Sequence, residues 1–236
     1  MMGKTVSLIV PTYNERENIK LLIPQIFASC KKIGAKIEVV IVDDNSPDGT
    51  AKAARTFGKK YNVRVIVRNK KIDLASAVKT GFSEAKGDIL GVMDADMSHP
   101  PEVLPLLIRP ILENKADLTI GSRHAKGGGV EVWPLSRKLM SKAATLLAYP
   151  LTGIKDPMSG LFFTRRRVIE GVKLETRGYK ILLEIIVKGR YSKAIEVPYT
   201  FRNRTVGKSK IGLSEYSNYL GGLLRLYFYR LKKKRI

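Results

Sequence analysis

The chain of 236 residues is 44% hydrophobic and carries 43 Lys and Arg against 21 Asp and Glu, a formal net charge of +22. This size allows one sizeable α/β domain or two small ones, and the excess of cations favours an anionic partner: nucleic acid, an acidic membrane surface or a phosphorylated substrate. The single cysteine, Cys30, excludes an internal disulfide and gives no zinc cluster, which suits a reducing compartment.

The first half of the chain alternates apolar strands with helices. The first residues lead straight into a strand, so we expect no signal peptide. Ser46 is interpreted as the N-cap of the second helix, with Pro47 at its first position. The spacing predicts parallel strands joined by right-handed crossovers. The expected strands cover residues 6–11, 37–42, 63–67 and 89–93, and the helices between them cover 15–32, 47–57 and 74–85.

An acidic pair, Asp94 and Asp96, follows the fourth of these strands directly. In extended backbone, side chains two residues apart point to the same side, so both carboxylates would face one space. Two carboxylates that close repel each other unless a cation or a proton lies between them. Mg²⁺ or Mn²⁺, shared with a substrate pyrophosphate, would resolve that repulsion. The alternative is a surface turn, where Asp is common because its side chain bonds nearby backbone amides.

Three polar loops leave the carboxyl ends of the predicted strands, over residues 11–15, 43–49 and 94–99. Ligands of open α/β sheets bind beyond those ends, so this convergence favours a nucleotide site. The usual dinucleotide motif, Gly-x-Gly-x-x-Gly, is missing after the first strand. Residues 207–209, Gly-Lys-Ser, lack the upstream glycine of a P-loop.

The second half of the chain is more basic. A strand over 117–121 is followed by a glycine-rich segment, 126–130, which we interpret as a flexible lid. The next helix, 136–149, shows an apolar face and a polar stripe. The apolar face contains Leu139, Ala143, Leu146 and Leu147, and the polar stripe contains Arg137, Ser141 and Thr145. A short strand over 161–164, a helix over 179–188 and a strand over 194–197 complete the expected elements.

Residues 213–236 form an aromatic, amphipathic tail that ends in a basic cluster. The segment 216–229 is too short to span a bilayer and is interrupted by Arg225, so it favours a membrane interface, the alternative being a helix packed on the sheet. We divide the chain into a catalytic domain, 1–212, and this tail. Neither a Cys/His finger nor a glycine-aromatic RNA signature supports binding of nucleic acid.

Three motifs, at residues 10–15, 42–50 and 93–96, together resemble the inverting, nucleotide-sugar type of family 2 glycosyltransferases. Further motifs at 121–123, 159–162, 178–184 and 204–210 are similar to the branch whose acceptors are polyprenyl phosphates. The resemblance covers about residues 5–215. It implies a Rossmann-like α/β fold of the glycosyltransferase A type, with helices flanking a mostly parallel central sheet. It also implies metal-assisted transfer of mannose from GDP-mannose to the phosphate of dolichol.

The resemblance assigns roles to individual residues. The nucleoside would be held by Pro11, Tyr13, Glu15, Ile41 and Asp43, to which the acidic pattern adds Asp44. Metal and diphosphate would be held by Asp94, Ala95 and Asp96, with Ser98 where some relatives carry a glutamine ligand. Phosphates or sugar would meet Arg123, Lys180, Arg204 and Lys210, and the lipid phosphate would meet Arg123, Arg137 and Ser141. Catalysis would depend on Asp94, Asp96 and Arg123.

The chemistry needs no strong general base, because a phosphate monoester is already ionised near neutral pH. The harder problem is that two anionic substrates must approach each other while negative charge builds on the leaving diphosphate. A divalent ion and bidentate arginines would stabilise this charge. A glucosyltransferase or an undecaprenyl-phosphate sugar transferase that uses a UDP-sugar is the alternative within this class. A basic nucleic-acid-binding protein and a non-catalytic membrane module are the alternatives outside it. We expect a peripheral enzyme on the cytoplasmic leaflet, and a separate membrane-anchoring subunit stays open.

Overall fold

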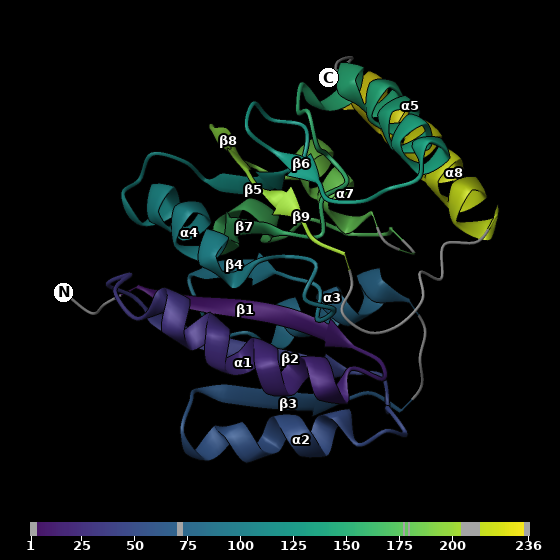
Figure 1. Ribbon diagram of the computed structural model, residues 1–236. Helices are drawn as coiled ribbons and strands as arrows, with labels where there is room; N and C mark the ends of the chain where they lie inside the picture. The colour runs from purple at the N-terminus through teal and green to yellow at the C-terminus, as the bar shows by residue number, and fades with distance from the viewer. Residues whose placement is uncertain (1–3, 70–72, 177, 179, 204–212, 234–236) are drawn as a thin grey trace.

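The computed structural model describes residues 4–69, 73–176, 178, 180–203 and 213–233 (Figure 1). A seven-stranded sheet with the strand order β3-β2-β1-β4-β7-β5-β8 runs through the molecule, and a second sheet pairs β6 with β9. Helices cover both faces of the large sheet (Figure 1). The predicted fold, a mostly parallel α/β sheet flanked by helices, is therefore confirmed.

The first four strands pair in parallel, as the sequence predicts. They are β1 (Thr5–Thr12), β2 (Lys36–Asp43), β3 (Val63–Val67) and β4 (Ile89–Val92). The connecting helices are α1 (Arg16–Cys30), α2 (Thr50–Thr56) with a short 3₁₀ turn (Phe57–Lys59), and α3 (Leu74–Glu84). Alternate side chains of β1 enter two different cores: Leu8 packs under α1 and α4 (Leu104–Leu112), and Ile9 packs under α3 and α7 (Ile181–Lys188). Burial on both faces explains why these strands read as continuous apolar runs.

The second half of the sheet contains one reversed strand. Strand β7 (Phe162–Arg165) lies antiparallel between β4 and β5 (Leu118–Ser122), and β8 (Ala194–Pro198) pairs in parallel with β5. Gly91 of β4 faces the ring of Phe163, and a Cβ at this position would collide with that ring. The glycine therefore allows β7 to pack against the inner strand that carries the acidic pair.

One local prediction is wrong. Helix α2 begins at Thr50 rather than after Ser46, because Gly49 takes a left-handed conformation (φ +83°) and the Ser46 hydroxyl turns back to Asp43. The segment expected to be a flexible lid contains β6 (Gly129–Val130), which pairs in parallel with β9 (Thr200–Phe201). No local pattern in the sequence reveals this backbone pairing with β9.

Helices α5 (Leu135–Thr152) and α8 (Leu213–Lys233) lie side by side at one edge of the molecule (Figure 1). Tyr219 and Tyr227 of α8 donate hydroxyl hydrogen bonds to backbone carbonyls of α5, at 2.6 and 2.9 Å. Leu183 of α7 joins the same apolar cluster. The C-terminal helix therefore packs on the protein along one side. None of the helices in the described part of the chain combines enough length with enough apolar character to cross a membrane.

The predicted apolar face of α5 points outward, contrary to the usual expectation. Leu146 is 72% exposed, and Leu139 and Leu147 are exposed as well, whereas Arg137 and Ser141 are half-buried. Helical periodicity predicts which residues share a face, but it does not predict which face meets the protein. Here the packing contacts with α7 and α8 come from a separate set: Ala144, Ala148 and Leu151.

Candidate active site

The first two polar loops form one hydrogen-bonded edge beyond β1 and β2. The Thr12 hydroxyl donates to Asp43 Oδ1 at 2.9 Å, and the Asn14 backbone N–H donates to Ser46 Oγ at 2.9 Å. The Glu15 N–H donates to Thr50 Oγ1 at 3.0 Å. These bonds hold the loops together, and the predicted convergence at the carboxyl ends of the strands is present.

The residues predicted to hold the nucleoside differ in their placement. Tyr13 and Glu15 are half-buried on this edge, and Pro11 is buried behind them. Asp43 also accepts from the Ser46 N–H and hydroxyl, so it orders the loop from a buried position. Ile41 lies fully buried in the core, and the structure does not bring its side chain to the edge.

Asp44 forms a buried ion pair with Arg68, with 2.6 Å between Nη2 and Oδ1. Arg68 also donates to Ser76 Oγ at 2.6 Å, which ties the second loop to α3. This role of Arg68 was not predicted from the sequence. The only sequence feature that could have indicated it is the position of the arginine between the end of a predicted strand and a predicted helix.

The third loop carries the acidic pair and begins beside β1, because the Met93 N–H donates to the carbonyl of Ile9. Asp96 is only 5% exposed, and its Oδ1 accepts from the Ser98 N–H (3.1 Å) and the Ser98 hydroxyl (2.5 Å). The side chain of Asp94 is 30% exposed. Ala95 and Ser98 are buried. The two carboxylates therefore have different surroundings, and Ser98 fixes the orientation of Asp96.

Asp94 is oriented from behind by His99 and Gly160. The His99 Nε2 atom lies 3.2 Å from Asp94 Oδ2. A Cβ on Gly160 would lie 2.7 Å from the same oxygen and 3.1 Å from His99 Nε2, so a side chain there would displace the Asp94 carboxylate. His99 is buried beside Tyr199 and Phe201, with ring centroids 5.5 Å apart in each case. No local pattern in the sequence predicts this contact of His99 with Asp94.

The donor set fits a hard divalent cation that is shared with a substrate. Two carboxylates and a neighbouring hydroxyl, from Asp94, Asp96 and Ser98, are the oxygen ligands that Mg²⁺ and Mn²⁺ take. Among the described residues, no cluster of three or more His, Cys, Asp or Glu side chains could hold a metal. A metal at the acidic pair would therefore need oxygens from another source, and a diphosphate can supply them.

Arg123, at the end of β5, is engaged by a buried carboxylate. Its Nε and Nη2 atoms donate to Asp156 Oδ2 (2.8 Å) and Oδ1 (2.7 Å), and its backbone N–H donates to Oδ2 (2.9 Å). The side chain of Arg123 is 12% exposed and that of Asp156 is 0% exposed. Burial alone would raise the pKa of Asp156, but the hydrogen bonds and charge of Arg123 outweigh it and hold the pKa below its ordinary value. Asp156 therefore keeps Arg123 charged and oriented.

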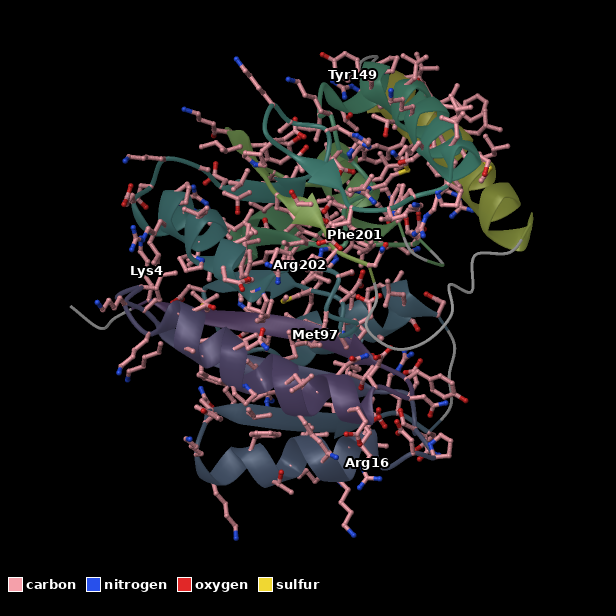
Figure 2. The ribbon with its side chains drawn as sticks, viewed as in Figure 1. Lys4, Arg16, Met97, Tyr149, Phe201 and Arg202 are labelled. Atoms are coloured by element: carbon pink, nitrogen blue, oxygen red, sulfur yellow. The ribbon has the colours of Figure 1, made fainter. Side chains whose placement is uncertain are left out.

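Arg137 and Arg123 approach the same indole ring. The guanidinium carbon of Arg137 lies 4.1 Å from the centroid of the Trp133 ring, and that of Arg123 lies 5.4 Å from it. Trp133 packs edge-on against Phe201, with centroids 5.6 Å apart. Figure 2 shows Phe201 and Arg202 in the middle of the molecule, near Met97 of the acidic loop. The segment that carries them is bonded to this loop, because the Arg202 N–H donates to the carbonyl of Ser98. One aromatic cluster thus joins the acidic loop to the arginine pair.

The remaining predicted residues lie elsewhere or are not described. Lys180 precedes α7 and lines a cavity of about 600 Å³ together with Tyr219 and Arg225 of α8. Arg204 and Lys210 lie outside the described residues. Ser141 is half-buried on α5, about one turn after Arg137.

A Rossmann-like sheet with an acidic pair after the inner strand β4, and an arginine after β5, defines the glycosyltransferase A-type class of enzymes. Residues 7–172 match Glycosyl transferase family 2, so the chain belongs to this family. The resemblance that the motifs indicate is therefore confirmed at the level of the family.

Two named relatives are similar to this chain over most of its length. Over 225 residues the chain is 50% identical to a dolichol-phosphate mannosyltransferase of Pyrococcus furiosus, in an alignment that covers 94% of this chain and 63% of that relative. It is 40% identical over 240 residues to the protein of the same name from Saccharomyces cerevisiae, covering 97% and 89%. The chain thus spans less than two thirds of the archaeal relative and most of the yeast one.

Solved structures agree with the fold. Mannosyl-3-phosphoglycerate synthase from Rubrobacter xylanophilus is similar at 21% identity and a TM-score of 0.67, covering 98% of this chain and 75% of that one. Glucosyl-3-phosphoglycerate synthase from Mycobacterium tuberculosis, solved with Mn²⁺, UDP and phosphoglyceric acid, is 19% identical with a TM-score of 0.69, covering 97% and 78%. At these identities the likeness concerns the fold alone.

Proposed function

We propose that the chain transfers mannose from GDP-mannose to dolichyl or another polyprenyl phosphate with inversion, giving the mannosyl phospholipid and GDP. One observation carries the proposal: a single aromatic cluster holds the acidic loop and two arginines together. His99 and Trp133 both pack on Phe201, His99 contacts Asp94, and both arginines approach the Trp133 ring. A site for a metal-bound diphosphate and a site for a second phosphate are thereby adjacent. The names of both relatives support mannose as the sugar and dolichyl phosphate as the acceptor.

On the donor side, Asp94 and Asp96 would hold Mg²⁺ or Mn²⁺ together with the diphosphate of the sugar nucleotide. When bound, such an ion supplies Lewis-acid stabilisation of the charge that develops on the leaving diphosphate. The Mn²⁺ and UDP in the mycobacterial structure support a divalent metal. The chain's own part is orientation: Ser98 donates to Asp96, and His99 contacts Asp94.

On the acceptor side, a phosphate oxygen attacks the anomeric carbon from the face opposite the leaving GDP, which inverts the configuration. The phosphate monoester is ionised near neutral pH, so the step needs no proton abstraction. The remaining difficulty is that two anionic substrates must approach each other. Arg123 and Arg137 provide fixed positive charge for this approach, and Asp156 holds Arg123 in place.

The outward faces of α5 and α8 support a peripheral position on the membrane that contains the acceptor. Leucines and a phenylalanine project from the paired helices into solvent: Leu139, Leu146 and Leu147 from α5, and Leu220, Leu224, Phe228 and Leu231 from α8. Apolar side chains on a cationic helix pair suit the interface of an anionic bilayer. Helix α5 begins next to Trp133, so this surface would deliver a lipid phosphate to Arg137. We place the enzyme on the cytoplasmic leaflet.

The test is a comparison of donors. Radiolabelled sugar transfer to a polyprenyl phosphate is measured from GDP-mannose and from UDP-glucose, each with and without a chelator. We expect transfer from GDP-mannose that the chelator abolishes and that added Mg²⁺ or Mn²⁺ restores. Transfer from UDP-glucose alone would overturn the choice of donor, and transfer that persists in chelator would overturn the role of the metal.

A further inference from the structure

We propose that Trp133 is a positioning residue that holds Arg137 beside Arg123, so that the two guanidinium groups present one site to the acceptor phosphate. This inference rests on the proposed function and adds a specific residue to it. The indole ring contacts both guanidinium groups and packs on Phe201. Its role would be exerted through Arg137.

The geometry around the indole supports the proposal. The Arg137 guanidinium carbon lies 4.1 Å from the ring centroid, the distance of a stacked cation–π contact, and Arg123 approaches the same ring. Arg123 is fixed independently by its ion pair with Asp156. Arg137 lies in the first turn of α5, which begins two residues after Trp133. The indole ring contacts both guanidinium groups, so it sets where Arg137 lies relative to Arg123.

The indole is itself held by the small sheet. The Glu131 N–H donates to the carbonyl of Phe201 at 3.0 Å, two residues before Trp133. Trp133 is 9% exposed and packs with Phe201, Tyr199 and the partly buried Val130. Pairing of β6 with β9 thus places the ring before α5 begins. A rigid aromatic ring suits a positioning role, because contact with it reduces the rotamer freedom of a long arginine side chain.

The kinetic test compares Trp133→Phe and Trp133→Ala with the wild-type chain. We expect the KM for the polyprenyl phosphate to rise about tenfold in the alanine variant and about threefold in the phenylalanine variant, which keeps a smaller ring. The KM for GDP-mannose should stay within about twofold. The matched control is Phe27→Leu, which removes the stacked contact of Phe27 with Tyr61 near the opposite edge of the sheet. It should lower stability and leave the acceptor KM unchanged. Equal rises in both KM values for Trp133→Ala would overturn the positioning role.

A binding test needs no catalysis, because Trp133 is the single tryptophan of the chain. Its fluorescence is followed while citronellyl phosphate, a short isoprenyl phosphate monoester, or the alcohol citronellol is added. We expect a saturable change with the phosphate, none with the alcohol, and loss of the change in Arg137→Ala. A response that survives Arg137→Ala, or that citronellol also gives, would overturn the inference. If no sugar is transferred from any donor yet this response is present, the proposed function fails and the phosphate site stands.

Discussion

Replacing Asp156 by asparagine should destabilise the fold strongly, because it leaves the buried Arg123 guanidinium without its counter-charge. The asparagine side chain would keep the shape and one acceptor oxygen, but it cannot accept both guanidinium hydrogen bonds. Breaking a buried ion pair by removing one partner costs about 3–5 kcal/mol, and the retained acceptor suggests the lower end of that range. At about 2–4 °C per kcal/mol for a chain of this size, Tm should fall by roughly 6–12 °C.

Thermal unfolding followed by circular dichroism at neutral pH measures this change. The matched control is Glu113→Gln, which breaks the exposed ion pair with Lys115 and should move Tm by no more than about 1 °C. A carboxyl group with a depressed folded-state pKa stabilises the fold above its unfolded pKa and loses that contribution as pH falls through the folded value. The Tm difference between wild type and variant should therefore be complete above about pH 4 and shrink below it. An Asp156→Asn variant with wild-type Tm at neutral pH would refute the reasoning.

Three further predictions concern the acidic pair and the exposed helices. Gly160→Ala places a Cβ 2.7 Å from Asp94 Oδ2, so the affinity for Mn²⁺ in the presence of GDP should fall at least about tenfold. Calorimetry measures this affinity, and circular dichroism should show an intact fold. Ser98→Ala removes the hydroxyl donor to the second carboxylate of the pair, and the same titration should show a loss of about tenfold; unchanged affinity would contradict the orienting role. Leu146→Glu should weaken co-sedimentation with anionic vesicles and leave transfer to citronellyl phosphate intact, whereas the same change at the exposed Leu106 of α4 should not affect co-sedimentation.

The sequence predicted the strands of the first half because burial on both faces leaves a direct trace in it. Runs such as residues 37–42 and 89–92 are apolar throughout or nearly so, and their parallel order follows from the helices between them. Because parallel strands end at the same edge of a sheet, the sequence also predicted that the polar loops lie together. The antiparallel strand β7 was found as a strand, but its position between β4 and β5 depends on long-range pairing that no local pattern records.

The candidate site was predictable only where a residue stands at a strand end. Asp94, Asp96 and Arg123 could be selected in this way. Asp156 could not, because it lies 33 residues from Arg123 in the chain and comes beside it only through the fold. Trp133 gave no signal either, since a single aromatic residue before a helix usually belongs to the core.

The orientation of α5 could not be predicted from the sequence either. Its periodicity separated the polar stripe from the leucines, yet the leucines face outward and Arg137 faces inward. A rule derived from water-facing helices assigns the apolar face to the interior. The contacts of α5 with α7 and α8, which the sequence alone does not show, decide which of its faces meets the protein.

The most direct test of the central claim is the location of a divalent ion in crystals grown with GDP and Mn²⁺. We expect an anomalous manganese peak within coordinating distance of the Asp96 carboxylate, with Asp94 beside it and the GDP diphosphate completing the coordination. A manganese peak elsewhere, or GDP bound away from the loop that follows β4, would contradict it.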